Sequence, residues 1–212
     1  MKRYESYKDS GVEWIGEIPS HWDVKRFKDC HHEIDVRVEE EWSTFQLLSL
    51  SKQGVIPRDI DSGVGKFPTS FTDYKVVEPM DLVFCLYDIE ETPRTIGLSY
   101  LNGMITGSYK VFRTTDVNPR YTYYTYLTID DVKGLKPHYT GLRNVVRPET
   151  FKSLHFLVPP LPEQEQIVSY LDGKTGEIDS TIDSEKKKID LLKEYRQSLI
   201  SSVITGKIKV VD

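Results

Sequence analysis

Apolar residues alternate at spacings of three and four along the last quarter of the chain. Two seven-residue series make up this pattern: Val168, Thr175, Ile182, Ile189, Arg196 and Val203, and, offset by three, Leu171, Ile178, Glu185, Leu192 and Leu199. The spacing predicts one long helix whose apolar seam forms a coiled coil with a partner. About forty residues at ~1.5 Å each make a rod ~60 Å long. Glu185 and Arg196 interrupt the seam, and such polar residues can fix register and partner choice.

Prolines mark the start of this helix. The segment Val158-Pro159-Pro160-Leu161-Pro162 predicts a stiff connector, and Pro162 suits the first turn because its missing N–H is not needed there. Gly173 and Gly176 predict a loosened or bent section, and Gly206 predicts the helix end. We therefore expect a globular domain over residues 1–160, a spacer and dimerisation helix over residues 161–206, and a tail or short strand over residues 207–212.

The first 158 residues combine short β-favouring runs with turn residues and short helical segments. Strands are predicted near residues 81–87, 95–100 and 109–113, with Asn102-Gly103 as a hairpin turn between two runs. Short helices are predicted at residues 130–135 and 148–154. The expected fold class is α+β: a mixed globular domain followed by a long C-terminal helix that pairs antiparallel with a partner.

Charge and cysteine content limit the possible functions. The 212 residues include 28 Lys and Arg against 33 Asp and Glu, a net charge of -5. A nucleic-acid binder usually carries a basic excess, so any such surface here is expected to be a local patch. No apolar run reaches the ~18 residues of a membrane span, and the N-terminus lacks the pattern of a signal peptide. Two cysteines make no disulfide framework, which favours a cytoplasmic location.

Catalytic and metal-binding patterns are weak in this sequence. Cys30-His31-His32 with Asp35 resembles part of a metal site, but no second ligand pair accompanies it. A half-buried strand with polar edge residues is the favoured interpretation. No cofactor-binding glycine-rich turn and no convincing carboxylate cluster is found, so we expect no catalytic residues, metal or cofactor in this chain.

Candidate nucleic-acid contacts come from three polar segments. Residues 107–126 interleave cations with tyrosines, which indicates either phosphate and base contacts or simple packing of a sheet; the two interpretations have equal weight. Residues 49–58 and 140–144 predict polar loops with cations and amides. The candidate DNA-binding residues are Lys52, Gln53, Arg58, Lys110, Arg113, Arg120, Arg143 and Asn144.

Three segments together resemble a known family. The opening at residues 7–22 (YKDSGVEWIGEIPSHW), the junction at residues 158–167 (VPPLPEQEQI) and the close at residues 192–207 (LKEYRQSLISSVITGK) resemble the specificity (S) subunits of type I restriction–modification systems. The resemblance spans the chain in the right order, and its opening and junction are specific. Trp14, Ile18 and Trp22 are expected to hold the N-terminal segment on the domain.

The resemblance implies a non-catalytic DNA-recognition subunit. Members of the family usually carry two recognition domains and two antiparallel spacer helices, whereas this chain has one of each. A half-length subunit is therefore expected to act as a homodimer on a bipartite, palindromic site. A fragment, or a natural half that pairs with a different half, is equally open. The expected dimerisation residues are Leu171, Ile178, Ile182, Ile189, Leu192, Leu199 and Val203.

The resemblance also implies the partners. Besides double-stranded DNA, the chain would bind methyltransferase (M) subunits and, through the complex, restriction–translocase (R) subunits. S-adenosylmethionine, magnesium and ATP are expected on those partner subunits. The rival hypotheses are a compact nuclease or modification enzyme with a coiled-coil tail, and a scaffold that binds protein through its helix.

Overall fold

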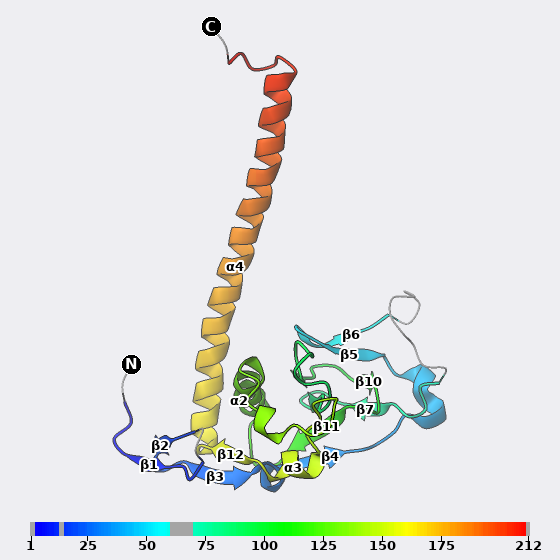
Figure 1. Ribbon diagram of the computed structural model, residues 1–212, viewed down its shortest axis with the longest axis vertical. Helices are drawn as coiled ribbons and strands as arrows, with labels where there is room; N and C mark the ends of the chain where they lie inside the picture. The colour runs from blue at the N-terminus through cyan, green and yellow to red at the C-terminus, as the bar shows by residue number, and fades with distance from the viewer. Residues whose placement is uncertain (1–2, 13–14, 60–69, 211–212) are drawn as a thin grey trace. The chain divides into compact units, whose positions relative to one another are not determined.

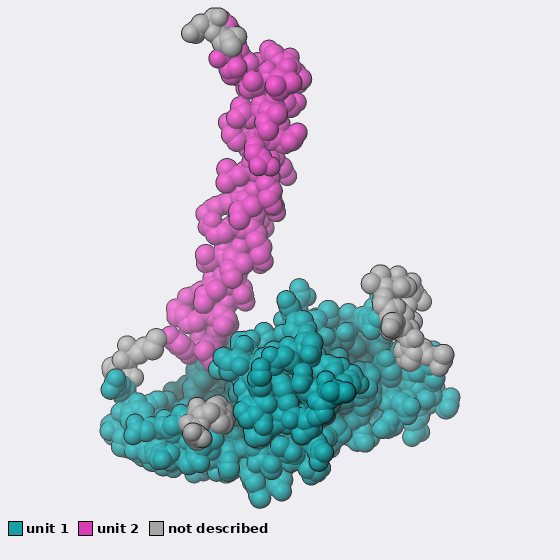
Figure 2. All heavy atoms as spheres, in the orientation of Figure 1, with its two compact units in different colours: residues 1–168 teal, residues 169–212 magenta. Residues whose placement is uncertain are grey.

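The computed structural model describes residues 3–12, 15–59 and 70–210. It divides the chain into two compact units, residues 1–168 and residues 169–212 (Figure 2). The helices (Figure 1) are α1 (Phe27–Cys30), α2 (Pro119–Asp131), α3 (Pro148–Ser153) and α4 (Leu161–Ile204), with 3-10 turns η1 (Glu39–Thr44) and η2 (Lys136–His138). The strands are β1 (Tyr7–Asp9), β2 (Glu17–Pro19), β3 (Asp23–Arg26), β4 (His31–Ile34), β5 (Leu48–Ser51), β6 (Gly54–Pro57), β7 (Lys75–Val77), β8 (Leu82–Phe84), β9 (Ile96–Leu98), β10 (Gly103–Ile105), β11 (Lys110–Thr114) and β12 (His155–Val158).

A four-stranded antiparallel sheet is the largest sheet of the first unit. Its strand order is β4-β11-β8-β9, and four further antiparallel pairs surround it: β1-β2, β3-β12, β5-β6 and β7-β10. Strand β8 is buried on both faces, as expected for a central strand made only of Leu82, Val83 and Phe84. The strands are short because turn residues interrupt every apolar run.

An aromatic core fills the space between the sheet and the helices. Phe27, Phe84, Phe112 and Phe151 are buried, with ring centroids 4.7–6.0 Å apart and mostly in edge or tilted geometry. Aromatic rings favour such arrangements because the positive edge of one ring meets the negative face of another. This core orients the loops that leave the sheet.

Helix α2 contains most of the tyrosine-rich segment. Asn118 caps it through a hydrogen bond from Arg120 N (2.9 Å), and Pro119 supplies its first position. Tyr121 and Tyr126 face the core from this helix. The prediction that these tyrosines pack from a strand is therefore wrong for residues 121–126, because Asn118 and Pro119 start a helix after β11.

The first turns of α4 belong to the first unit and are bonded to it. The Glu163 carboxylate accepts hydrogen bonds from Tyr4 (2.5 Å), His21 (2.8 Å) and Trp22 (3.2 Å). Burial would raise the pKa of Glu163, but these donors outweigh it and lower the pKa. Gln164 is fully buried, where it accepts from Asn118 N and donates to Pro159 O.

The opening segment holds to the fold through two of its three expected anchors. Ile18 is buried in β2, and Trp22 donates to Glu163. Trp14 lies outside the described residues. The opening and the junction that carry the family resemblance therefore meet at the carboxylate of Glu163.

The second unit consists of the rest of α4 and residues 205–210. The helix is continuous through Gly173 and Gly176, so the predicted loosening there is wrong. It ends at Ile204, and Gly206 adopts a positive φ of 75° with its N–H on Val203 O, as a terminating glycine should. The described residues 207–210 form no strand.

Two other local predictions fail. Asn102 precedes β10 and Gly103 is its first residue, but β9 and β10 pair with β8 and β7 instead of with each other. The predicted helix at residues 130–135 is the end of α2 and a turn, while the helix predicted at residues 148–154 is confirmed as α3. A turn signal fixes a reversal locally, but the partners of short strands depend on the whole sheet.

Candidate nucleic-acid interface

Arginines and tyrosines from four loops gather on one surface of the first unit, here called the tyrosine–arginine face: Arg58, Tyr74, Tyr87, Tyr109 and Arg143. The rings of Tyr87 and Tyr109 lie 6.0 Å apart, and the Arg143 guanidinium lies 5.0 Å from the centre of the Tyr87 ring. The charge of Arg58 acts on both Tyr74 and Tyr109 and lowers their pKa, although burial outweighs it and raises both. The face thus places two cations beside three phenols.

Loop geometry presents Arg143 at this face. Thr140 and Val145 close the loop with two backbone hydrogen bonds of 2.8 and 3.1 Å, and Gly141 between them takes a positive φ of 68°. Asp88 N donates to Arg143 O (2.7 Å), which ties the loop to the segment that follows β8. The backbone is therefore held at both ends while the Arg143 side chain stays exposed.

Carboxylates already engage this loop. Arg143 pairs with Asp88, and the pair raises the pKa of Arg143 and lowers that of Asp88. Asn144 Nδ2 donates to Glu91 (3.3 Å). Both contacts are on the surface, where ion pairs contribute little to stability.

The β5–β6 hairpin carries a second predicted pair. Lys52 and Gln53 form its exposed turn, where Ser51 Oγ accepts from Gln53 N (3.1 Å) and Gly54 adopts a φ of 95°. An exposed lysine and an exposed amide at a hairpin tip suit contact with a nucleic-acid groove. Arg58 follows this hairpin directly, so the hairpin leads into the tyrosine–arginine face.

Lys110 and Arg113 are held in ion pairs within the sheet. Lys110 lies 2.7 Å from Glu33, and Arg113 lies 2.8 Å from both Asp81 and Glu78. The Asp81 side chain is fully buried, so removing Arg113 would leave a buried carboxylate without its cation. These contacts favour a structural role for both residues.

The segment of residues 107–126 divides between two roles. Tyr109 lies on the tyrosine–arginine face, while Tyr121 and Tyr126 are in the core. Arg120 lies half-buried in the first turn of α2. Sequence analysis missed Tyr74 and Tyr87, because only the strand pairing brings these separate positions to Tyr109.

The polar cluster at residues 30–35 is explained by packing. His31 is buried against Phe27 (3.9 Å between ring centres), and its two ring nitrogens bond Phe27 O (2.8 Å) and Thr122 Oγ1 (3.0 Å). Burial lowers the pKa of His31 to about 4, so the ring is neutral at physiological pH. Within the described ranges, no three His, Cys, Asp or Glu side chains are placed to hold a metal ion.

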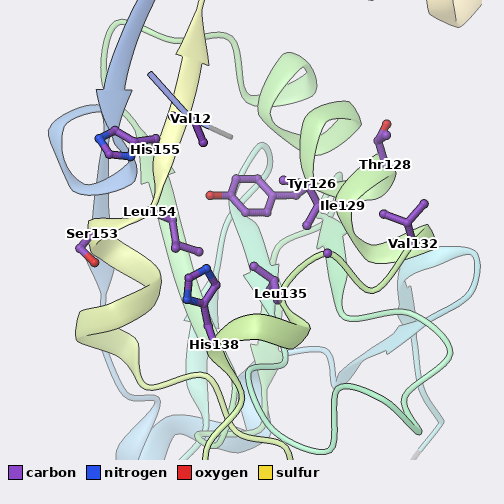
Figure 3. A pocket seen from close by; sticks show the side chains of 11 residues that line it. Val12, Tyr126, Thr128, Ile129, Val132, Leu135, His138, Ser153, Leu154 and His155 are labelled. Carbon is purple, nitrogen blue, oxygen red and sulfur yellow. The ribbon is translucent and has the colours of Figure 1, made fainter. Parts of the chain in front are cut away.

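A cavity of about 480 Å³ lies elsewhere on this unit, between α2, the following turn and β12 (Figure 3). Tyr126, Ile129, Leu135 and Leu154 give it a mainly apolar lining, with His138 and His155 at its wall. None of the described residues that line it is a Lys or an Arg. Phosphate groups require cations or donors in number, so this cavity is not part of the candidate interface.

Comparison with known proteins shows which family part of this chain resembles. Residues 96–194 match the family model described as "Type I restriction modification DNA specificity domain". Over these residues the chain is similar to the type I restriction–modification DNA specificity domain. This match confirms the resemblance to that family which the sequence predicted.

One curated protein and several solved structures are similar to this chain. The type I restriction enzyme EcoKI specificity subunit of Escherichia coli (strain K12) is 31% identical over 65 residues, which cover 31% of this chain and 14% of that protein. A chain from a structure on complex assembly and conformational transition of the type I R-M system has a TM-score of 0.66 at 15% identity, covering 92% of this chain and 48% of that one. The HsdS subunit from Thermoanaerobacter tengcongensis has a TM-score of 0.59 at 16% identity, covering 95% and 48%.

The structural likeness confirms the fold class. These solved chains share both the mixed α+β unit and the long C-terminal helix. At 15% and 16% sequence identity, the likeness shows the fold alone. The chain spans about half the length of these solved chains. No described helix has both the length and the apolar character needed to cross a membrane.

Proposed function

We propose that this chain is the DNA-reading half of a type I specificity subunit and that two copies together read a bipartite site. The observation that carries the proposal is the exposed apolar seam of α4, in a fold for which nearly the whole chain aligns with about half of each solved chain. A two-fold dimer would place two recognition units on a palindromic target with a fixed gap.

The tyrosine–arginine face and the β5–β6 hairpin are the proposed DNA-contacting surface. Lys52, Gln53, Arg58, Arg143 and Asn144 supply cations and amides there, which suit phosphates and base edges. Lys110, Arg113 and Arg120 remain candidates from sequence, but the ion pairs of the first two favour the fold over the DNA. With a net charge of -5, partner subunits would contribute further cations around the DNA.

The second unit provides the proposed pairing surface. Ile178, Ile182, Ile189, Leu192 and Leu199 are 40–65% exposed, and Leu171 and Val203 are partly buried. An exposed apolar seam of this length requires a partner helix in water. M subunits would bind this dimer and carry S-adenosylmethionine, and R subunits with magnesium and ATP would join the complex.

Two measurements test the proposal. Analytical ultracentrifugation of the full chain at tens of micromolar should show a dimer; a strict monomer would contradict the homodimer, and pairing only with a different half would redirect it. Methylation mapping of DNA from cells that carry this chain with its M subunit should show a bipartite, palindromic target. Absence of sequence-specific methylation, together with M binding through the helix alone, would favour the scaffold hypothesis.

A further inference from the structure

Two charged residues of opposite sign interrupt the exposed seam of α4. Glu185 and Arg196 occupy seam positions of the two heptad series, and both are exposed in the single chain. Glu185 bonds Lys188 on its own helix (2.6 Å). Arg196 has no acidic residue three or four positions away on the helix, since Leu192, Lys193, Leu199 and Ile200 occupy those sites. Its charge is thus available to another chain.

A parallel pair of these helices would be unstable. Parallel pairing places equivalent seam positions opposite each other, so Glu185 would face Glu185 of the partner subunit and Arg196 would face Arg196 of the partner subunit. Like charges desolvated in a seam repel strongly. An antiparallel pair instead brings positions of one series opposite positions of the other.

One antiparallel register pairs the two charges. With the two-fold axis between Asp190 and Leu191, Glu185 faces Arg196 of the partner subunit, and symmetry repeats the pair. The same register makes the surrounding layers apolar: Ile189 faces Leu192 of the partner subunit, Ile182 faces Leu199 of the partner subunit, and Ile178 faces Val203 of the partner subunit. The seam is therefore self-complementary.

Neighbouring registers lose this match. A shift by one heptad places Glu185 opposite Ile189 or Val203 of the partner subunit and leaves both charges against apolar side chains. In the matched register, Lys186 lies beside Lys193 of the partner subunit, but each lysine is already paired with an aspartate on its own helix, Asp183 (3.2 Å) and Asp190 (2.9 Å). The repulsion between these lysines is therefore reduced, while Glu185 and Arg196 in the seam pair with opposite charges.

We propose that a second copy of this chain packs antiparallel along residues 177–204 of α4, in the register fixed by two symmetric Glu185–Arg196 ion pairs. This proposal rests on the homodimer proposed above and adds its register. The overlap is about 42 Å long at ~1.5 Å per residue and begins just beyond Gly176, so both glycines of the helix lie outside it. The register sets the distance between the two recognition units and hence the gap of the bipartite site.

Charge reversal in the full-length protein tests the register. Glu185→Arg alone, or Arg196→Glu alone, creates two like-charged layers and should weaken the dimer ~30-fold or more in sedimentation equilibrium. The double variant E185R/R196E restores opposite charges and should return the dissociation constant to within a few-fold of the original. Matched controls on the outer face, Lys187→Glu and Glu194→Arg, should leave it unchanged.

Disulfide capture gives a second readout that does not depend on charge. Ile182→Cys with Leu199→Cys in one chain should form interchain disulfides on oxidation, whereas Ile182→Cys with Leu192→Cys should not; the native Cys30 and Cys85 are buried. A dimer that is indifferent to charge reversal, or that cross-links only in the second variant, overturns the register and leaves the homodimer standing. A monomeric parent chain overturns both.

Discussion

The two units of the chain differ in how much of their apolar surface is buried. Residues 1–168 enclose an aromatic core, and among the described side chains only Arg94 Nε and Tyr139 OH are buried polar atoms without a hydrogen-bond partner. The helix of residues 169–204 leaves its isoleucines and all its leucines except Leu171 exposed. The first unit therefore buries its apolar side chains within the chain, while burial of the α4 seam would require the proposed second copy.

This contrast has a consequence for where mutations act. Substitutions in the core of the first unit should change the free energy of unfolding, whereas substitutions in the seam of α4 should change association. Charge at the seam should act on partner choice, and charge at the tyrosine–arginine face on DNA affinity. The predictions below separate these effects.

The largest effect is expected from Phe27→Ala. Phe27 is fully buried and contacts Phe84, Phe112, Tyr126 and Phe151, so its removal leaves a cavity that rigid neighbours cannot fill. We expect a loss of ~3–5 kcal/mol in denaturant unfolding followed by tyrosine and tryptophan fluorescence.

Its matched control lies in the other unit. Ile189→Ala, at a side chain 52% exposed, should leave that unfolding transition within ~0.5 kcal/mol while weakening the dimer. If Ile189→Ala destabilised the first unit as much as Phe27→Ala does, the division between the two units would be wrong.

Acid should destabilise the first unit through His31. Its pKa is lowered by burial from 6.5 to about 4 in the folded chain, so the unfolded chain binds the proton first as the pH falls. Stability should be constant above about pH 6.5 and decline by ~3 kcal/mol as the pH approaches 4.

A pH series of unfolding curves measures this decline. His31→Gln should lower stability overall but flatten its dependence between pH 6.5 and 4.5, whereas the exposed His32→Gln should keep the original slope. An unchanged slope in His31→Gln would show that other groups cause the acid sensitivity.

A smaller loss is expected at the junction. Gln164 satisfies two backbone groups, Asn118 N (2.9 Å) and Pro159 O (2.8 Å), that Gln164→Leu would leave buried and unpaired. We expect a loss of ~2 kcal/mol in unfolding. The neighbouring Gln166 is exposed, so Gln166→Leu serves as a control that should unfold as the parent does. Equal stability of both variants would remove Gln164 from the anchoring of α4.

The periodic part of the chain was the most predictable from sequence. A heptad pattern over five repeats and prolines at its start specify a helix locally, and the structure has that helix from Leu161 to Ile204. The two glycines did not interrupt it, because about 1 kcal/mol of lost propensity at each is small against so many helical hydrogen bonds. No comparable local pattern in the sequence predicts what the helix pairs with, apart from the charges of Glu185 and Arg196.

The candidate site was predictable only in part. Arg58 and Arg143 were selected as cations in polar loops, and the structure places both on one face. Tyr87 and Tyr74 were not, because their proximity to Tyr109 depends on strand pairing between distant segments. Residue type also could not distinguish the structural arginine from the exposed one. Only the fold shows that Arg113 pairs with the buried Asp81, whereas Arg143 lies on an exposed loop and pairs with Asp88.

The smallest effect, and the one that tests the face directly, is expected from Arg143→Ala. Arg143 already pairs with Asp88 and stacks on Tyr87, so contact with DNA replaces an existing surface pair and its net contribution is modest. We expect specific binding by the assembled methyltransferase to weaken about 10-fold at fixed salt, with the unfolding curve unchanged. Arg26→Ala is the matched control, since Arg26 is an exposed arginine at the end of β3 that pairs with Asp29 (3.1 Å) and is not one of the residues of the face. Equal loss in both variants would indicate a general effect of charge, and no loss in Arg143→Ala would move the DNA-contacting surface away from Tyr87 and toward the β5–β6 hairpin.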